Sequence, residues 1–478
     1  MLVSSAPPKT SPTLFAREFA AVRLGDRRRE QRLQRVVEQC RAAPRDSFPD
    51  IAPTTADLTG LYRFIGSDAV TMGAILEPHS HETAKRCAEA GKVLVIHDTT
   101  ELAFAGPSRR KLGKLRSNDD QGFLAHVALA VAGDGSRRPL GILGVHTWAR
   151  AELGNARRQD GARKNGADYH NQVGKESDRW FQLIDQTQDR LGGVHAIHVG
   201  DREADAFHLM RDAFDHEVSF VFRMARDRVL LDEDDERLGR TSEVLSDCQD
   251  VFRLEVPLSR RVAKPMPSST ESAREERTAN LAVRGVKTRI ARPNYDRQSP
   301  PSLEVHIVYV REIDPPADVE PVSWVLMTTE PIDSPRQMRE VVEIYRTRWI
   351  IEELFKALKT GCAFEKRQLE SYETLTNALG IFLPIAWHLL LLRHHAQHTP
   401  DEPAERVLSP VQIDVIRARF PTLLPRAPTA ADALRAVAYF GGHFIKRPPG
   451  WLILARGLEE LLTMETGWRL ARGIGPEM

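Results

Sequence analysis

Apolar residues recur along this chain with two different spacings, and the spacing changes near residue 90. Residues 15–40 have the spacing of an amphipathic helix, and a second helical stretch surrounds Arg63. From Lys92 onward, short runs of β-branched residues alternate with turn residues, which is typical of strands. The pattern therefore predicts a helical module of about 85 residues followed by an α/β layer.

Two of the predicted strands run into acidic residues. The apolar run that begins at Lys92 ends in His97-Asp98-Thr-Thr, and residues 194–199 are followed directly by Gly200-Asp201. A buried apolar run that gives way to acids and hydroxyls is typical of a strand that ends at a functional edge. A strand-end Asp is also common in turns and caps, so each acid alone is weak evidence.

The residues between these two strands predict how the layer is built. Residues 123–131 and 140–148 flank the turn Ala-Gly-Asp-Gly-Ser, which is a strong hairpin signal. Residues 174–191 have a helical pattern, and 218–223 form a further apolar run. The order strand, hairpin, helix, strand, helix, strand predicts a mixed sheet in an α/β fold.

The second half of the chain begins with polar, alternating text and ends in helices. Residues 227–320 predict an antiparallel β insertion with a positive face. An apolar strand with Trp324 follows, then one long helix from Ser334 through Lys359, and further helices after about residue 372. The basic residues that recur along the insertion are Arg260, Arg261, Lys264, Arg284, Lys287 and Arg289.

The long helix carries an unusual edge. At about 100° per residue, Tyr345, Arg348, Glu352 and Lys359 fall within an arc of roughly 60°. A carboxylate there could bind a metal while the cations hold phosphates. A solvated face with i, i+4 charge pairs such as Glu352–Lys356 explains the same pattern, and the helix alone does not separate the two.

Composition places few limits on function. Lys and Arg (67) balance Asp and Glu (66), so a nucleic-acid surface must come from local clusters such as the Arg-rich helix within residues 15–40. A charge run of this kind is also typical of a solvated helix face. The four cysteines have no zinc spacing and indicate reduced thiols of a cytosolic protein.

The chain shows no signal-peptide pattern and no expected membrane span. Its longest apolar run, Ile381 to Leu392, is too short to cross a bilayer and contains Pro384 and His388. We therefore expect a soluble intracellular protein.

Asp98, Asp201 and Glu352 form the candidate catalytic set. Two divalent cations about 3.5–4 Å apart need bridging and flanking carboxylates, and together they activate an attacking oxygen and stabilise the leaving oxygen of a phosphodiester. Mg²⁺ takes few protein oxygens and adds substrate phosphate, so three carboxylates suffice.

The same motifs resemble those of a known family. His97-Asp98-Thr-Thr, Gly200-Asp201-Arg-Glu-Ala-Asp205 and Tyr345-x-x-Arg348-x-x-x-Glu352-x-x-x-x-x-x-Lys359 are similar to the three acid motifs of the DDE transposases. The likeness is to the insertion-sequence-four family, most closely its transposon-five type. It extends over most of the chain, through Arg17-Glu-Phe, Tyr62-Arg63-Phe64, Lys175-Glu176-Ser177 and Trp451. The insertion and the C-terminal region match only at scattered positions.

The resemblance implies roles for individual residues. Asp98, Asp201 and Glu352 would bind two Mg²⁺ ions, for which Mn²⁺ would substitute, in a ribonuclease H-like core. Trp324 would stack on a flipped base, or is a core residue of its strand, and Trp349 is interpreted as packing. The residues expected to contact DNA are Tyr345, Arg348, Lys359, Lys356, Trp324, Arg223, Arg28, Arg29, Arg32 and Arg63.

The resemblance also implies an architecture and an activity. The predicted activity is cut-and-paste transposition by a homodimer on double-stranded DNA in the bacterial cytoplasm, without a membrane. The alternatives are a two-metal nuclease of the same fold and a catalytically silent DNA-binding regulator. The expected domains are a helical DNA-end-binding domain (1–88), a catalytic core in two parts (89–226 and 321–372), the β insertion (227–320) and C-terminal dimerisation helices (373–478).

Overall fold

The computed structural model describes residues 14–115, 121–150, 178–258, 275–444 and 449–473, apart from residues 298 and 318. Strands of the described part form one mixed sheet with the order β2-β3-β1-β5-β6-β12-β11-β10-β7-β8, with β4 beside β3 and β9 beside β10. The strands are β1 (Lys92–Phe104), β2 (Gly113–Lys114), β3 (Gln121–Ala132), β4 (Pro139–Trp148), β5 (His195–Gly200), β6 (Ser219–Arg223), β7 (Val229–Leu231), β8 (Arg237–Arg240), β9 (Phe252–Leu258), β10 (Arg277–Ala291), β11 (Ser302–Glu312) and β12 (Ser323–Thr328).

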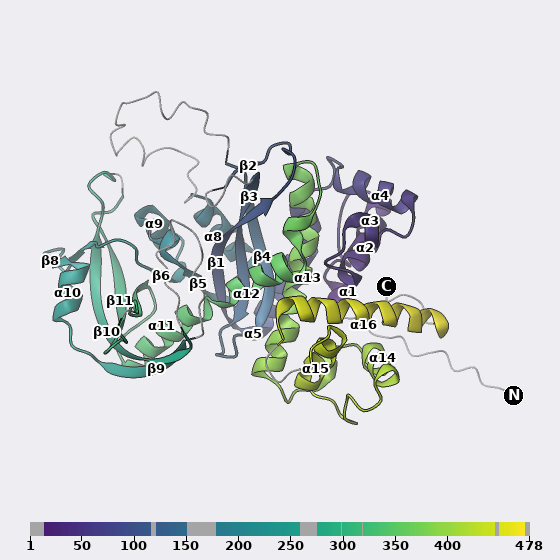
Figure 1. Cartoon of the computed structure of the whole chain (residues 1–478). Helices are drawn as coiled ribbons and strands as arrows, with labels where there is room; N and C mark the ends of the chain where they lie inside the picture. Colours follow the sequence, from purple (N-terminus) through teal and green to yellow (C-terminus); the bar gives the residue numbers. More distant parts are fainter. Residues whose placement is uncertain are drawn as a thin grey trace.

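Helices flank the sheet and form both ends of the described part of the chain. They are α1 (Leu14–Arg17), α2 (Arg27–Ala42), α3 (Phe48–Ile51), α4 (Thr55–Ile65), α5 (Met72–Ala90), α8 (Asp178–Leu191), α9 (Phe207–Asp215), α10 (Thr241–Asp247), α11 (Pro335–Thr347), α12 (Ile350–Lys356), α13 (Tyr372–His398), α14 (Pro410–Arg419), α15 (Ala430–Phe440) and α16 (Trp451–Ala471). Shorter turns are η1 (Arg202–Ala204), η2 (Ala357–Gly361), η3 (Phe364–Lys366) and η4 (Ala404–Arg406). Figure 1 shows the insertion strands and the N-terminal helices on opposite sides of the core sheet.

The core sheet has the mixed topology that the pattern predicts. β5 pairs in parallel with β1 and with β6, while β3 runs antiparallel to β1 and β4 antiparallel to β3. Alternate residues of β1 enter different clusters: Val93 and Val95 pack with α5 and α8, whereas Leu94 and Ile96 belong to the large cluster that includes α12 and α13. This alternation fixes which side chains of β1 face α12.

β1 is longer than expected. It continues to Phe104, and beyond Ile96↔Val199 its only strand partner in the described part is β3. Asp98 therefore lies within the strand and not at its end, which corrects the prediction. Asp201 does follow the end of β5, as predicted.

The insertion continues the core sheet. β10 and β11 pair antiparallel, as expected, and β11 pairs with β12, which in turn pairs with β6. Arg284, Lys287 and Arg289 lie on β10. The expected basic residues Arg260, Arg261 and Lys264, and the Lys175-Glu176-Ser177 motif, lie outside the described residues.

The N-terminal helix is interrupted. α1 ends at Arg17, and α2 begins only at Arg27, where Asp26 caps it by accepting a hydrogen bond from the Arg28 amide at 2.7 Å. Gly25 precedes the cap at a φ of +70°, a conformation that favours glycine. One continuous helix over 15–40 was therefore the wrong expectation.

A buried polar network ties this module to the core. Glu18 is fully buried and accepts hydrogen bonds from Arg86 and from the Nδ1 of His79 at 2.5 Å. The Ile142 amide donates to the other ring nitrogen of His79, which makes that nitrogen an acceptor and the imidazole neutral. The network joins the N-terminal module, α5 and β4.

α13 is the central helix of the molecule (Figure 1). By length and composition alone it could cross a membrane, but 94% of its apolar window is buried inside the protein. A helix that is apolar on every side fits such a position. Helices α2, α4 and α15 contact it, and the Asn377 side chain donates to the carbonyls of Ile65 (2.9 Å) and Val70 (2.8 Å).

The expected long helix is divided. α11 ends at Thr347 and α12 begins at Ile350, and Arg348 and Trp349 form a turn between them. The chain then continues into the π-helical turn η2. The junction contains no Gly or Pro, so the sequence carries no strong signal for the break.

Candidate active site

The three predicted acids come together at one edge of the core sheet. Asp98 and Asp201 each lie two residues beyond the last parallel pair of β1 and β5, Ile96↔Val199. Glu352 lies in the first turn of α12, which packs on β1. The negative charges of Asp201 and Glu352 both raise the pKa of Asp98, so the three carboxyl groups are close enough to interact electrostatically.

Arg348 links two of these acids. Its guanidinium donates to Asp98 Oδ2 at 3.0 Å and to Glu352 Oε1 at 2.9 Å. Only 9% of the Arg348 side chain is exposed, so the ion pairs are largely shielded from water. The third acid is held separately, because Asp201 caps η1 by accepting from the Glu203 amide at 2.9 Å.

The proton affinities of the pair follow from this arrangement. Burial, the largest cause, raises the pKa of Asp98 to about 7; Arg348 opposes the shift, and the charges of Asp201 and Glu352 add to it. Burial alone would lower the pKa of Arg348, yet Asp98 and Glu352 raise it above its usual value. Arg348 is therefore a permanent cation beside a carboxyl group that ionises with difficulty.

The donor types fit a hard divalent cation. Three carboxylates in one place are the ligands that such ions prefer, and the excess negative charge around Asp98 is what a cation would neutralise. In the described ranges, however, no three acidic, histidine or cysteine side chains lie at the spacing of a bound metal. Arg348 already provides positive charge between Asp98 and Glu352.

Three buried imidazoles lie beneath the acids, and sequence reasoning missed them. The Nε2 of His97 is 2.8 Å from the Nδ1 of His198, and the His126 ring stacks on His97 with centroids 5.5 Å apart. Trp180 of α8 covers His126 at a centroid distance of 4.3 Å. Burial lowers the pKa of His126 and of His198 to about 3 and that of His97 well below its usual value. The stack therefore joins β1, β3 and β5 without charge.

The other residues expected to hold phosphates are partly engaged within the protein. Tyr345 is 3% exposed, and its ring lies 5.7 Å from that of Trp324. Lys359 Nζ donates to the Glu101 carbonyl at 2.6 Å. Lys356 is exposed and pairs with Glu353 at 2.7 Å, not with Glu352 as the surface-helix interpretation supposed.

The two tryptophans have opposite exposures. Trp324 is 9% exposed, whereas Trp349 is 52% exposed, with the Arg348 guanidinium 5.1 Å from its ring centre. The interpretation of Trp349 as packing was therefore wrong. Arg223 donates to the Ser323 carbonyl at 2.9 Å, which places it beside Trp324 on β12.

The predicted basic residues of the N-terminal module differ in solvent exposure and in their partners within the protein. Arg28 and Arg63 are exposed, whereas Arg32 pairs with Asp57 at 3.3 Å and Arg29 donates to the Leu24 carbonyl at 3.2 Å. Arg28 and Arg63 therefore face solvent most openly, and Arg32 and Arg29 also serve the fold.

Glu353, next to the candidate acid Glu352, joins α12 to the C-terminal helices. Its Oε2 accepts from the Trp451 indole at 3.1 Å and lies 3.2 Å from Arg393. The Arg393 guanidinium lies over the Trp451 ring at 4.6 Å. The start of α16 is thus connected directly to the helix that carries Glu352.

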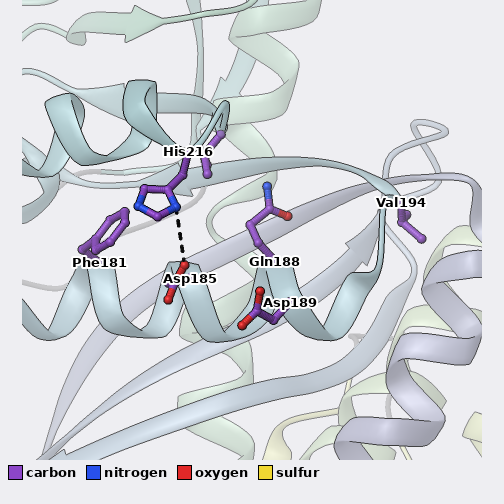
Figure 2. A pocket seen from close by; sticks show the side chains of 8 residues that line it. Phe181, Asp185, Gln188, Asp189, Val194 and His216 are labelled. Atoms are coloured by element: carbon purple, nitrogen blue, oxygen red, sulfur yellow. Dashed lines mark ion pairs between the residues drawn. The ribbon is translucent and has the colours of Figure 1, made fainter.

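Two cavities lie away from the acids. The smaller, about 280 Å³, is lined by one side of α8 and by residues just before β5 and β6, at the opposite end of these strands from Asp201. Figure 2 shows its His216 ring directed toward Asp185, 3.8 Å away. The larger, about 740 Å³, lies over β10, β11 and β12. Its lining includes Arg226, Arg284 and Arg311 together with Asp227, and Asp250 pairs with both Arg284 and Arg311.

Comparison with known proteins finds two family models. Transposase DNA-binding matches residues 12–70, which include Arg28, Arg29, Arg32 and Arg63. Transposase DDE domain matches residues 166–385, which include Asp201 and Glu352 and begin after Asp98. A DDE domain implies a ribonuclease H-like fold and the general use of divalent metal ions, and the mixed sheet with helical flanks agrees with that fold.

Among solved structures, the chain is similar to one titled "Cryo-EM structure of piggyBac transposase synaptic complex with hairpin DNA (SNHP)". The identity is 8% and the TM-score 0.35, over 93% of this chain and 72% of that chain. A likeness this weak carries no argument. The family matches, by contrast, show a transposase DNA-binding domain and a DDE transposase domain in this chain, and they support a DDE transposase that acts on DNA.

Proposed function

We propose that this chain is a cut-and-paste DNA transposase of the insertion-sequence-four family, most similar to the transposon-five type. One observation carries the proposal: Asp98, Asp201 and Glu352 converge from two neighbouring strands and a helix. Two of these acids lie within the match to the DDE domain. The reaction would comprise nicking by water, hairpin formation by the freed 3′ hydroxyl, hydrolytic opening and strand transfer.

Asp98, Asp201 and Glu352 are the residues that would hold the metal. When bound, two Mg²⁺ ions, or Mn²⁺ in their place, supply activation of the attacking oxygen and stabilisation of the leaving oxygen. The protein's part is to present three carboxylates on rigid elements. The stacked imidazoles fix the spacing of β1 and β5, and the Glu203 amide fixes the Asp201 side chain.

Side chains around the acids would handle the DNA. Tyr345, Arg348 and Lys359 hold the phosphates of the transposon end, with Lys356 at the margin. Trp324 would stack on a base released from the bent hairpin, a contact worth about 1–3 kcal/mol. Arg223 lies beside Trp324 and would follow the backbone.

The flanking helices would supply recognition and assembly. Of the four predicted basic residues of the DNA-binding domain, Arg28 and Arg63 are exposed, so they are the first of these four candidates for reading the transposon end. A homodimer would pair two ends through the C-terminal helices, and the Trp451–Glu353 contact would connect that assembly to the active site. We place this activity in the bacterial cytoplasm.

The triad is tested by three single substitutions. Asp98→Ala, Asp201→Ala and Glu352→Ala should each abolish Mg²⁺-dependent cleavage of a duplex with the element's terminal repeat, while binding of that duplex persists. Cleavage by any variant at a near wild-type rate would refute the assignment of that acid. Asp185→Ala, on the remote cavity, is the matched control and should cleave normally.

A nuclease of the same fold is the main alternative. Incubation with a pre-cut end and a target plasmid separates the two activities, because only a transposase converts the end into a covalent joint. Cleavage without joining would favour the nuclease. A regulator without catalysis would bind the end and do neither, which the intact acid set argues against.

A further inference from the structure

Arg348 lies at a joint in the backbone. It is the first residue after α11. The Arg348 amide donates a hydrogen bond to the Tyr345 carbonyl at 3.0 Å, and the Arg348 carbonyl accepts one from the Ile351 amide at 3.1 Å. Both contacts span three residues, so the helix is locally tightened before α12 begins. A short, irregular turn between two helices is a place where a side chain can be redirected with little change elsewhere.

The guanidinium is held by the acids but not fully satisfied. It makes one hydrogen bond to Asp98 and one to Glu352, and its Nε is buried with no hydrogen-bond partner among the described residues. A buried donor without a partner is costly, so this arrangement is stabilised mainly by the two carboxylate charges. It depends on those charges remaining unneutralised.

A metal ion and this guanidinium compete for the same charges. A divalent ion bound between Asp98 and Glu352 would place two like charges within a few ångströms of each other. In the described residues the acids are not arranged around a metal position, and Arg348 is the cation that they contact. Metal entry therefore requires Arg348 to leave at least one carboxylate.

DNA offers the guanidinium another partner. A phosphate can accept two parallel hydrogen bonds from arginine, and these would replace the two single bonds, one to Asp98 and one to Glu352, that Arg348 gives up. The Trp349 ring is 52% exposed and lies 5.1 Å from the guanidinium, so the guanidinium lies close to a side chain that reaches solvent. A phosphate beside Trp349 would be close enough to accept hydrogen bonds from the Arg348 side chain in place of the carboxylates.

We propose that Arg348 is an internal counter-cation that keeps Asp98 and Glu352 from binding metal until a DNA phosphate withdraws it. This inference rests on the proposed function, and it makes metal binding and DNA binding mutually favourable. Because such coupling is reciprocal, DNA should tighten metal binding by the same factor by which metal tightens DNA binding. Without DNA, the acids stay paired with Arg348.

The test is a titration with Mn²⁺ alone, followed by electron paramagnetic resonance of the free ion, using the full chain. Arg348→Gln should bind Mn²⁺ at least tenfold more tightly than wild type without DNA, because the competing charge is gone. Adding Asp98→Asn to Arg348→Gln should remove the gain. Arg346→Gln is the matched control, since Arg346 pairs with Glu343 on the same helix, and it should match wild type.

A second arm needs no Arg348 variant. A duplex with the element's terminal repeat should tighten Mn²⁺ binding by wild type about tenfold. The same duplex mixed with Asp98→Asn serves as the control, because it measures the Mn²⁺ that the DNA itself binds. Equal or weaker Mn²⁺ binding by folded Arg348→Gln, or no effect of the duplex on wild type, would overturn the inference. If wild type cleaves DNA in Mn²⁺, that failure leaves the proposed function standing; absence of metal-dependent cleavage would instead refute the proposed function.

Discussion

Two largely buried arginine–aspartate pairs, Arg228–Asp205 and Arg348–Asp98, are built differently. Asp205, four residues after Asp201, accepts from Arg228 Nε at 2.9 Å and from the amides of Ala225 (2.7 Å) and Arg226 (2.8 Å), so its oxygens are well satisfied. Arg348 donates to two acids, and its Nε has no hydrogen-bond partner in the part of the chain that the structure describes. The first pair holds a loop, whereas our proposal requires the second to exchange partners. The two pairs differ more in how completely their donors and acceptors are satisfied than in burial.

Asp205→Ala should have the largest effect on stability. It leaves the buried Arg228 guanidinium and two loop amides without their acceptor, so we expect a loss of about 3–5 kcal/mol in the free energy of unfolding. Urea denaturation followed by circular dichroism measures this. Asp227→Ala, in the same loop but exposed, should cost under about 1 kcal/mol; a similar loss in both variants would erase the contrast between the pairs.

The imidazole stack should make the core acid-sensitive. The pKa values of His97, His126 and His198 are lowered in the folded state, so their contribution to stability is complete above about pH 6.5 and is lost as pH falls toward about 3. Each imidazole adds a slope of up to about 1.4 kcal/mol per pH unit in that window. In His126→Phe, the free energy of unfolding should fall less steeply between pH 6.5 and 4.5 than in wild type, by the slope that one titrating group contributes. An unchanged slope would mean that His126 is charged in the folded protein.

Asp98→Asn should leave the fold intact or stabilise it. Because the folded pKa of Asp98 is raised to about 7, stability falls as pH rises from about 4 to 7, and the neutral amide avoids this penalty. We expect the free energy of unfolding to rise by at least about 1 kcal/mol at pH 8, after allowance for the lost ion pair with Arg348, and to change little at pH 4. Thermal unfolding at both pH values measures it, and a large loss at pH 8 would make this pair structural like Asp205–Arg228.

The smallest stability effect should come from Trp349→Ala. Half of the ring is already in water, so the free energy of unfolding should change by under about 1 kcal/mol. Trp324→Ala removes a buried ring and should cost about 3 kcal/mol. Chemical denaturation of the two variants side by side tests the assignment, and equal losses would return Trp349 to the core.

The sequence predicted the acids and the order of elements well, because motif spacing and apolar periodicity are local signals. Asp201 after β5 and the β3–β4 hairpin are examples. It misplaced Asp98 at a strand end, because the polar residues that interrupt the apolar run are supported by pairing with β3. It missed the break at Arg348, whose side chain contacts Asp98 from 250 residues away, and the imidazole stack, whose members come from three strands. The role of each site residue stays a prediction.

The position of α13 late in the chain also determines when the N-terminal module can complete its packing during synthesis. The N-terminal module packs on this late helix, and the Asn377 side chain donates hydrogen bonds to the carbonyls of Ile65 and Val70. A nascent chain that has emerged only as far as β12 therefore carries the DNA-binding helices with their apolar face uncovered. The module becomes complete only when nearly four-fifths of the chain has left the ribosome, so DNA recognition and the Glu352 helix mature at almost the same moment.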